Sequence, residues 1–344
     1  MVQYEGRYNA FDPSRIETYP LGERSNKVTL DDLVFPGALD TLDLRLPAPI
    51  QRDVTAVAEA IVAARRSKKP VILFTGAHLI KNGLGPLLAD LVERRFVTLV
   101  AGNAATAIHD FELALIGETS ENVPAALGEG QFGMAYEFAY INLALSVGNQ
   151  QKLGFGETLG RFICEEAFAR QILSLVAREG TPRPFQHPEI SVLAACHRRA
   201  VPFTVHAGIG TDVIDQHPSF DGQAKGGCSG RDFLIYTEEV SKLGEGGVVL
   251  NIGSAVTGPE VLLKAVSMAA NVGNAPRDIL TVDFDLRRYD PAQMTDEAAQ
   301  GYYFRDQKSI VTRIPQAFGG RGLYVQGDQK VTFPSLYREI LKQL

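Results

Sequence analysis

Short apolar runs alternate with segments of helical hydrophobic spacing along most of this chain. The clearest example begins with the apolar residues 71–74, which end in the small-residue turn Thr75-Gly76-Ala77. After Asn82-Gly83, leucine and valine recur at the spacing of a helix face, through Val92. A buried strand, a tight turn and an amphipathic helix form half of a βαβ unit, and open α/β folds place their ligands at such turns. The pattern predicts a nucleotide-type pocket here. An ordinary strand-to-helix corner fits the stretch equally well, because neither GxGxxG nor a Walker pattern is present.

The same alternation continues to the end of the chain. Further strands are predicted at 96–101, 201–205, 247–252 and 278–284, and helices at 54–66, 106–116, 189–199, 231–243, 259–271 and 333–344. Residues 132–176 are mostly helical in pattern with a candidate break at 155–158, and residues 287–322 are polar and irregular. Strands that alternate with helices predict a doubly wound α/β fold with a mainly parallel sheet and helices on both faces. We expect one domain over residues 51–344, preceded by an N-terminal arm over residues 1–50.

Composition narrows the class of protein. The 344 residues are 45% hydrophobic and 22% charged, which is ample for a large core. The formal net charge of −6, without runs of like charge, argues against a nucleic-acid partner and leaves amines open. The start lacks the pattern of a signal peptide, and no apolar stretch is long enough for a bilayer. The three cysteines are widely spaced, so neither a disulfide framework nor a CxxC zinc site is predicted. A cytoplasmic protein without a membrane partner is the expectation.

Four segments together resemble the deoxyhypusine synthase family. They are TGAHLIKNG at 75–83, LVAGNAATAIHDFE at 99–112, GGVVLNIGSAVTGPEVLLKA at 246–265 and DQKVTFP at 328–334. Their order and spacing follow that family from about residue 54 to the end of the chain. The resemblance implies an NAD cofactor, a polyamine donor such as spermidine, an amine or protein-lysine acceptor, and a homo-oligomer, a tetramer by resemblance.

The cofactor would lie at the strand-end turns. Glycines there let the backbone approach a pyrophosphate, and the following helix starts offer free N–H groups. Asp328 would accept hydrogen bonds from cofactor hydroxyls, although a solvated turn is the plain alternative. The expected cofactor-binding residues are Gly76, Ala77, His78, Asn103, Ala104, Gly253, Ser254 and Asp328.

The chain departs from the family where chemistry is needed. The family's nucleophilic lysine follows a tryptophan, but this chain has none, and Lys308 is the only lysine in the corresponding region. A desolvated lysine can form an imine, whereas the polar neighbours of Lys308 favour a solvated loop. A family His-His pair becomes Pro259-Glu260, so Glu260, His206 or His109 would supply the base.

The family's Glu-Glu-Asp becomes Ile108-His109-Asp110, which keeps only the last carboxylate. A polyamine site needs acidic residues to match each buried ammonium. The candidates for this role are Asp110, Asp212, Asp215, Asp221, Glu260 and Glu297. For chemistry, the sequence thus favours His109, Asp110, Glu260 and Lys308.

The expected function is NAD-dependent transfer of an aminoalkyl group from a polyamine to an amine acceptor. A non-catalytic NAD-binding or scaffold protein of the same fold is the first alternative, because a fold does not carry its function with it. A metal-dependent hydrolase is the second, since the segment HAGIGTDVIDQHPSFDG at 206–222 is dense in histidine and aspartate. That segment has none of the spacings of familiar metal motifs, such as HExxH.

Overall fold

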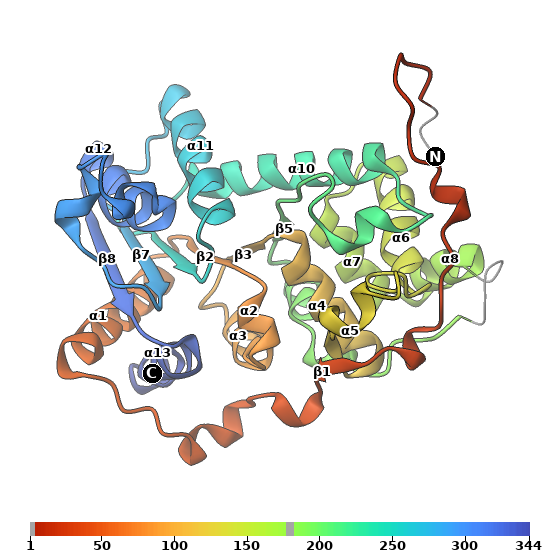
Figure 1. The fold of residues 1–344 in the computed structure, drawn as a ribbon. Coiled ribbons are helices and arrows are strands. Elements are labelled where there is room, and N and C mark those ends of the chain that lie inside the picture. The colour runs from red at the N-terminus through yellow and green to blue at the C-terminus, as the bar shows by residue number, and fades with distance from the viewer. Residues whose placement is uncertain (1–3, 177–181) are drawn as a thin grey trace.

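The computed structural model describes residues 4–176 and 182–344, so the first three residues of the expected arm lie outside it. Its centre is a parallel six-stranded sheet in the order β5-β3-β2-β6-β7-β8 (Figure 1). The expected α/β class with a mainly parallel sheet is confirmed. The strands are β2 (Val71–Thr75), β3 (Leu99–Gly102), β5 (Phe203–Val205), β6 (Val248–Ile252), β7 (Leu280–Asp285) and β8 (Arg321–Gln326).

The order of the strands reverses between β2 and β6, at the middle of the sheet. Every residue of these two strands is buried, as expected for parallel strands covered on both faces. Their register pairs Val71 with Val248 and Thr75 with Ile252, and Thr75 Oγ1 donates to the Ile252 carbonyl across 177 positions of sequence. The reversal makes the carboxyl ends of these strands the switch point of the sheet, near which such folds bind ligands.

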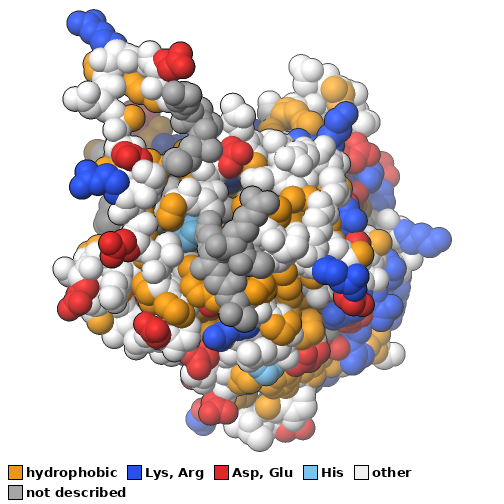
Figure 2. Space-filling view, turned by 90° about the vertical axis from the view of Figure 1, so that its right-hand side faces the viewer, with side chains coloured by type: hydrophobic (Ala, Val, Ile, Leu, Met, Phe, Trp, Pro, Cys, Tyr) orange, Lys and Arg blue, Asp and Glu red, His pale blue; other side chains and the backbone are white. Residues whose placement is uncertain are grey.

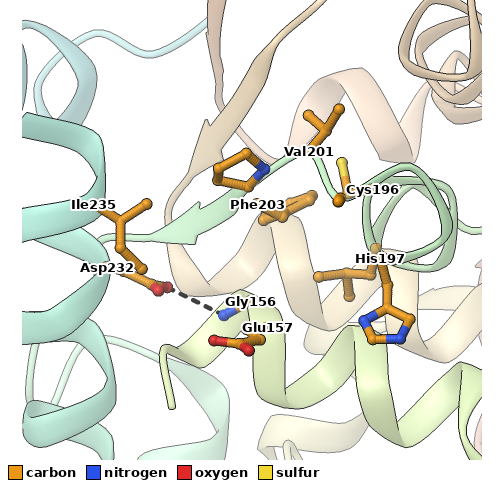
Figure 3. A pocket seen from close by; sticks show the side chains of 11 residues that line it. Gly156, Glu157, Cys196, His197, Val201, Phe203, Asp232 and Ile235 are labelled. Atoms are coloured by element: carbon orange, nitrogen blue, oxygen red, sulfur yellow. Dashed lines mark hydrogen bonds between the residues drawn. The ribbon is translucent and has the colours of Figure 1, made fainter. Parts of the chain in front are cut away.

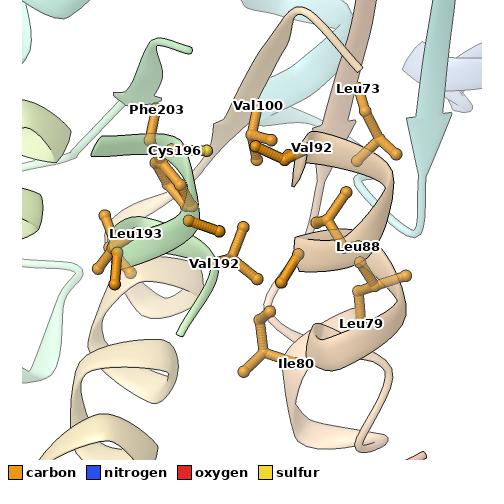
Figure 4. Packing of buried hydrophobic residues seen from close by; sticks show 14 of the residues in the cluster. Leu73, Leu79, Ile80, Leu88, Val92, Val100, Val192, Leu193, Cys196 and Phe203 are labelled. Atoms are coloured by element: carbon orange, nitrogen blue, oxygen red, sulfur yellow. The ribbon is translucent and has the colours of Figure 1, made fainter. Parts of the chain in front are cut away.

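Helices cover both faces of the sheet. On one face, α1, α3, α4, α9 and α13 pack their apolar sides against Leu73, Val100 and Leu250 of the strands. Figure 4 shows this layer where α3 and α9 meet in front of β2 and β3. On the other face, the second half of α10 pairs with α11 over Ile72, Phe74 and Val249. The helices are α1 (Ala48–Arg66), α2 (His78–Lys81), α3 (Gly85–Glu93), α4 (Ala104–Ile116), α5 (Val123–Leu127), α6 (Phe138–Gln150), α7 (Phe155–Cys164), α8 (Glu166–Val176), α9 (Val192–Arg199), α10 (Gly222–Val240), α11 (Thr257–Asn271), α12 (Ile314–Phe318) and α13 (Gln329–Lys342).

The segment before α1 runs along the outside of the molecule (Figure 1). Its strand β1 (Asn26–Val28) pairs antiparallel with β4 (Thr119–Glu121), which follows α4. It also packs closely on the turn after α2, because a Cβ on Gly83 would lie 2.0 Å from the Asp32 carbonyl oxygen. Among the described residues, no helix has the length and apolar character needed to span a membrane.

Among the elements that differ from the sequence-based expectation, three have a clear physical reason. Strand β8 was not expected, because it is an edge strand with mostly half-exposed residues. Helix α10 begins at Gly222, nine positions before the predicted 231, since glycines lower helix propensity and tertiary packing compensates. Residues 155–158 are the start of α7 and not a break, because Gly154 caps that helix.

Candidate functional site

A cavity of about 820 Å³ lies where β3 and β5 end, and we call it the edge cavity. It is bounded by the turns after these two strands, by the first half of α10 and by the beginning of α11. Its lining residues are Asn103, Ala105, His206, Ala207, Gly208, Ile209, Thr211, Asp212, Lys225, Gly226, Ser229, Gly230, Phe233, Thr257 and Val261. The carboxyl edge of the sheet therefore carries a cavity of the size that small ligands and cofactors occupy.

Helix α10 presents bare backbone to the edge cavity. Gly226 and Gly230 are four residues apart, so they lie on one face of the helix. A Cβ added to either glycine would meet no atom within 4 Å, which shows that both face open space. Ser229 lies beside them, and its hydroxyl donates to the Val205 carbonyl and accepts from Ala207 N–H. A ligand can thus lie directly against the helix surface.

Two helices begin at the edge cavity. Asn103 caps α4 by accepting from Thr106 N–H, and Ala105 of the first turn lines the cavity. Thr257, the first residue of α11, lines it from the other side. The N–H groups of a first helical turn have no partner within the helix, and the helix dipole adds positive potential there. The cavity is therefore suited to anionic groups such as phosphates.

A buried lysine organises the loop that follows β5. Lys225 is only 1% exposed, and its Nζ donates to the Gly208 carbonyl and to Asp212, both at 2.7 Å, and to Asp215. Burial raises the pKa of Asp212, against the opposing effect of the Lys225 ammonium. Because two carboxylates already neutralise this lysine, it has no free charge for a ligand. It holds the loop in place instead.

His206 forms an apolar wall of the edge cavity. Its ring stacks on Phe74 with centroids 5.5 Å apart and meets Tyr236 edge-on at 5.2 Å. Burial lowers the pKa of His206 to about 3, so the imidazole is neutral near pH 7. An imidazole this weakly basic cannot accept a proton efficiently near neutral pH. A role in packing and in shaping the cavity fits it better than the base role considered from the sequence.

The expected cofactor residues all follow strands at the same edge of the sheet, but of the eight only Asn103 lines the edge cavity. The turns after β2 and β6 touch each other, since a Cβ on Gly76 would lie 2.3 Å from the Gly253 carbonyl oxygen. His78 is exposed at the start of α2. Asn103 lines the cavity, whereas Asp328 caps α13 at the far edge strand by accepting from Lys330 N–H at 2.9 Å. Ala77, Ala104 and Ser254 complete these corners.

The four residues expected to carry chemistry are spread over the molecule. His109 lines a second cavity on the other side of the start of α4. Asp110 is fully buried, where it accepts from Ser191 Oγ at 2.6 Å and from two N–H groups at the start of α9. Burial raises the pKa of Asp110. Glu260 pairs with Lys264 on the surface of α11, and Lys308 Nζ lies 2.8 Å from the Tyr302 ring centroid. The structure does not bring these four groups together.

The acidic residues of the 206–222 segment have structural partners. Asp212 and Asp215 bind Lys225, and Asp221 caps α10 through Gln223 N–H and Ala224 N–H. His217 contacts Ser219, with Nδ1 2.7 Å from its hydroxyl. Within residues 4–176 and 182–344, no group of three or more His, Cys, Asp or Glu is arranged to hold a metal ion. The density of such residues here therefore reflects loop anchoring.

A third cavity, of about 310 Å³, lies at the opposite end of β5, and we call it the amino-end cavity (Figure 3). Asp232 of α10 closes it by accepting from Val205 N–H at 2.7 Å and Gly156 N–H at 3.1 Å. Gly156 packs directly on β5, because a Cβ there would lie 1.8 Å from the Phe203 carbonyl oxygen. Asp232 thus satisfies the outer edge of β5 and the start of α7 together.

Sequence reasoning missed Lys225 and Asp232, although a pattern could have indicated them. The stretch KGGCSGRD at 225–232 places the charged residues Lys225, Arg231 and Asp232 around glycines and a serine, which is unusual in a helix interior. In the part of the chain that the structure describes, the surface that carries α8 and the N-terminal arm has no side chains of one type gathered in a way that would mark a site (Figure 2). Figure 2 shows acidic, basic and hydrophobic side chains interspersed over it.

The fold and its carboxyl-edge cavity define the class: a Rossmann-like, doubly wound α/β protein. No family model matches the chain, and no curated protein does. Similar solved structures include the apo arginine dihydrolase ArgZ from cyanobacteria, 16% identical with a TM-score of 0.45, over 86% of this chain and 32% of that one. Another is the ternary complex of AgrE with ornithine and NAD+, 14% identical with a TM-score of 0.48, over 88% of this chain and 34% of that one.

A third similar structure is a LOR/SDH protein from Methanococcus maripaludis S2. It is 17% identical with a TM-score of 0.47, over 88% of this chain and 72% of that one. The chain spans about a third of the length of ArgZ and AgrE. These likenesses are to the fold alone.

The resemblance to deoxyhypusine synthase expected from the sequence is wrong, because the similar structures are ArgZ, AgrE and a LOR/SDH protein. Aminoalkyl transfer from spermidine or another polyamine is wrong with it. The physical reason is that small-residue turns after buried strands recur throughout doubly wound folds, so four of them in order do not identify one family. The cofactor expected from the sequence is NAD, and the AgrE complex contains NAD+.

Proposed function

We propose that the edge cavity binds a dinucleotide of the NAD class. The observation that carries this proposal is the meeting of two helix starts with a glycine-bearing helix face around one cavity of about 820 Å³. Ala105 and Thr257 place first-turn N–H groups at opposite sides of that cavity. Such groups bind phosphates without a basic side chain. Within the dinucleotide class we choose NAD, which is the cofactor expected from the sequence and the one bound by AgrE.

Gly226 and Gly230 support the proposal from the side of α10. Helix interiors disfavour glycine by about 1 kcal/mol relative to alanine, so two exposed glycines on one face need a compensating use. Close approach of a flat or bulky ligand to the helix backbone is such a use. Because Asp212 and Asp215 neutralise Lys225, we expect backbone N–H groups to bind the phosphates. The affinity should then change little with the salt concentration.

The test compares two substitutions at one position. Gly226→Leu fills the edge cavity, whereas Gly226→Ala adds only a Cβ that meets nothing within 4 Å. Titration calorimetry with NAD+, NADH and ATP is expected to show NAD binding to the wild type and to Gly226→Ala. Gly226→Leu should weaken NAD binding by at least about tenfold, because the side chain occupies the ligand's place.

Both variants should unfold at temperatures no lower than the wild type, since each improves helix propensity. Equal NAD affinity in Gly226→Leu and Gly226→Ala would show that the ligand does not lie in the edge cavity. Tighter binding of ATP than of NAD would replace the dinucleotide by a mononucleotide. The compartment and a homo-oligomer remain predictions.

A further inference from the structure

A smaller cavity of about 260 Å³ adjoins the edge cavity, and we call it the arm cavity because Arg24 of the N-terminal segment lines it. The two cavities share Ala105, Thr211 and Asp212 as lining residues, so they lie on either side of the start of α4. A ligand in the arm cavity would therefore lie next to a ligand in the edge cavity. The two spaces are arranged as neighbouring subsites.

The acidic groups of the arm cavity already have partners. Glu112 binds Arg24 Nη1 at 2.7 Å and also accepts from the Thr119 hydroxyl. Burial by itself would raise the pKa of Glu112. The Arg24 cation, together with His109 and the Thr119 hydroxyl, outweighs this effect and lowers the pKa to about 2. Glu121 accepts from Tyr19 at 3.1 Å and from Gly133 N–H at 3.0 Å. These carboxylates are committed to holding the wall.

The donors of the arm cavity are not all used. Arg24 is 7% exposed, and its Nη2 has no hydrogen-bond partner among the described residues. His109 Nδ1 lies 2.7 Å from the Thr119 hydroxyl, which donates to Glu112, so Nδ1 carries the proton of that contact. Nε2 is uncommitted within the described part of the chain and is a donor only in the imidazolium form of His109. Lys81 lines the same space, half-buried, and forms no ion pair with a described residue. An unused buried donor is costly unless a ligand or water meets it.

Cations and carboxylates both line the arm cavity: Arg24 and Lys81, with Glu112, Glu121 and Asp212, the last of which pairs with Lys225. Burial, Lys81 and His109 together lower the pKa of His78, which precedes Lys81 on α2. The remaining wall combines the apolar Ile108, Val123, Phe132, Phe138 and Val213 with the polar Ser120, Thr211 and Asp212. A ligand that satisfies both kinds of wall has one anionic end and one small hydrocarbon body.

We infer that the arm cavity binds the carboxylate of a small organic acid, which is the substrate class that would lie beside the dinucleotide. Arg24 and Lys81 would donate to the carboxylate, His109 would join them in its imidazolium form, and the apolar side chains of the wall would hold the rest of the ligand. Charge-assisted hydrogen bonds of this type are about twice as strong as neutral ones. The inference deepens the proposed function and rests on it for the role of the ligand as substrate, but binding itself can be measured without NAD.

The experiment uses the full chain and the branched 2-oxo acid 3-methyl-2-oxobutanoate as probe. Its binding is followed by ligand-observed NMR, with isobutyramide as the uncharged comparison and inorganic phosphate as a competing anion. We expect the 2-oxo acid to bind with a dissociation constant of about 1–10 mM and the amide to bind at least about tenfold more weakly.

Three variants locate the site. Lys81→Met should weaken 2-oxo acid binding several-fold, whereas Lys330→Met on the exposed start of α13 makes the same charge change without effect. The double variant Arg24→Gln/Glu112→Gln removes the free donor without leaving a buried lone carboxylate, and it should abolish measurable binding. NAD affinity should stay within about twofold in all three, because none of the substituted residues lines the edge cavity.

Each result decides the inference. Absence of 2-oxo acid binding to the wild type, or equal binding by wild type and double variant, would overturn it. Phosphate that binds more tightly than the 2-oxo acid and displaces it would also overturn it, because the cavity would then be a phosphate site. Failure of NAD binding with intact 2-oxo acid binding would overturn the proposed cofactor site and leave the carboxylate site in place.

Discussion

The two ends of β5 carry very different cavities, although the same helix covers both. At the carboxyl end, α10 contributes Gly226 and Gly230 to a cavity of about 820 Å³. At the amino end, it contributes Asp232 to a cavity of about 310 Å³ with a mostly apolar wall. Lys225 and Asp232 are seven residues apart, so they lie two turns apart on roughly the same side of α10.

The difference shows how one helix can serve both binding and stability. Beside the amino-end cavity, the Asp232 carboxylate accepts from the N–H groups of Gly156, in the first turn of α7, and of Val205, the last residue of β5. At the carboxyl end, Asn103 and Ser254 close the N–H groups of Thr106 and Gly258, whereas those of Ala105 and Thr257 have no acceptor inside their helices. Satisfied donors hold structure, and open donors are available to a ligand. Substitutions that remove a satisfied polar contact should therefore change stability, whereas substitutions beside open donors should change ligand binding.

The largest effect is expected at Lys225, which supports the loop of the edge cavity. Lys225→Met removes the cation between Asp212 and Asp215 and leaves two carboxylates close together and largely buried. We expect a loss of roughly 3–5 kcal/mol in the free energy of unfolding, measured by urea denaturation at pH 7. The triple change Lys225→Met/Asp212→Asn/Asp215→Asn should recover most of it. A loss below about 1 kcal/mol for Lys225→Met would show that the loop does not depend on this ion cluster.

The next effect is expected at the amino-end cavity. Asp232→Ala leaves two buried N–H groups without an acceptor, which should cost roughly 2–5 kcal/mol. Both N–H groups donate to the same oxygen, Oδ2, so Asp232→Asn can keep them and should cost less than about 1.5 kcal/mol. Burial raises the pKa of Asp232 to about 7, which makes the neutral amide a close mimic. Urea denaturation of both variants measures this, and equal losses would contradict the capping role.

A pH-dependent effect of intermediate size is expected at His206. Its pKa is about 3 in the folded protein and about 6.5 in an unfolded chain, so the unfolded state binds more protons between these values. Stability contributed by neutral His206 is therefore lost as pH falls from about 6.5 toward 3. The variant His206→Phe has no imidazole to titrate, so it lacks this loss of stability at low pH. Between pH 6 and pH 4 the variant should gain roughly 2–3 kcal/mol relative to the wild type.

Asp232 changes the stability of the wild type with pH in the direction opposite to His206, so the effect of His206 is measured as a difference from the His206→Phe variant. The pKa of Asp232 is raised in the folded protein, so that residue stabilises the fold as pH falls from about 7. The two trends oppose each other in the wild type. A stability difference between wild type and His206→Phe that does not change with pH would show that His206 titrates normally.

The smallest effect is expected at Glu260, on the outer surface of α11. Its pairing with Lys264 is between side chains that are 34% and 56% exposed, and such pairs contribute little. Glu260→Gln should change the free energy of unfolding by less than about 0.5 kcal/mol. NAD affinity by calorimetry should be unchanged, because Glu260 does not line the edge cavity. A large loss of NAD binding would give this carboxylate the functional role that the sequence suggested.

Much of the fold could be predicted because its central strands are mostly apolar, with Thr75 and Asn251 as the exceptions. The register-paired strands at Val71–Thr75 and Val248–Ile252 are buried at every position, so hydrophobicity alone indicates them. The edge strand Arg321–Gln326 is half-exposed and polar, and its pattern resembles that of a loop. The glycines of α10 concealed the first half of that helix, which is the half that lines the edge cavity.

The edge of the sheet that carries the candidate cavity was predictable, but the residues that line the cavity were not, since only Asn103 of the expected cofactor residues does so. Parallel strands bring their carboxyl ends to one edge, so the corners near Gly76, Asn103 and Gly253 were expected to lie together. Local patterns do not indicate which corners remain open, because that depends on distant packing. Arg24 meets Glu112 only through the path of the N-terminal segment, and no spacing in the sequence signals that ion pair.

The pairing of β2 with β6 also has a consequence for biosynthesis. Thr75 leaves the ribosome long before Ile252, its neighbour in the sheet. Until β6 is synthesised, an apolar strand with unpaired backbone groups has no partner on that side, and such edges favour association between chains. We expect nascent chains that stop before residue 248 to need a chaperone, and the complete chain to fold slowly because its central contacts are distant in sequence.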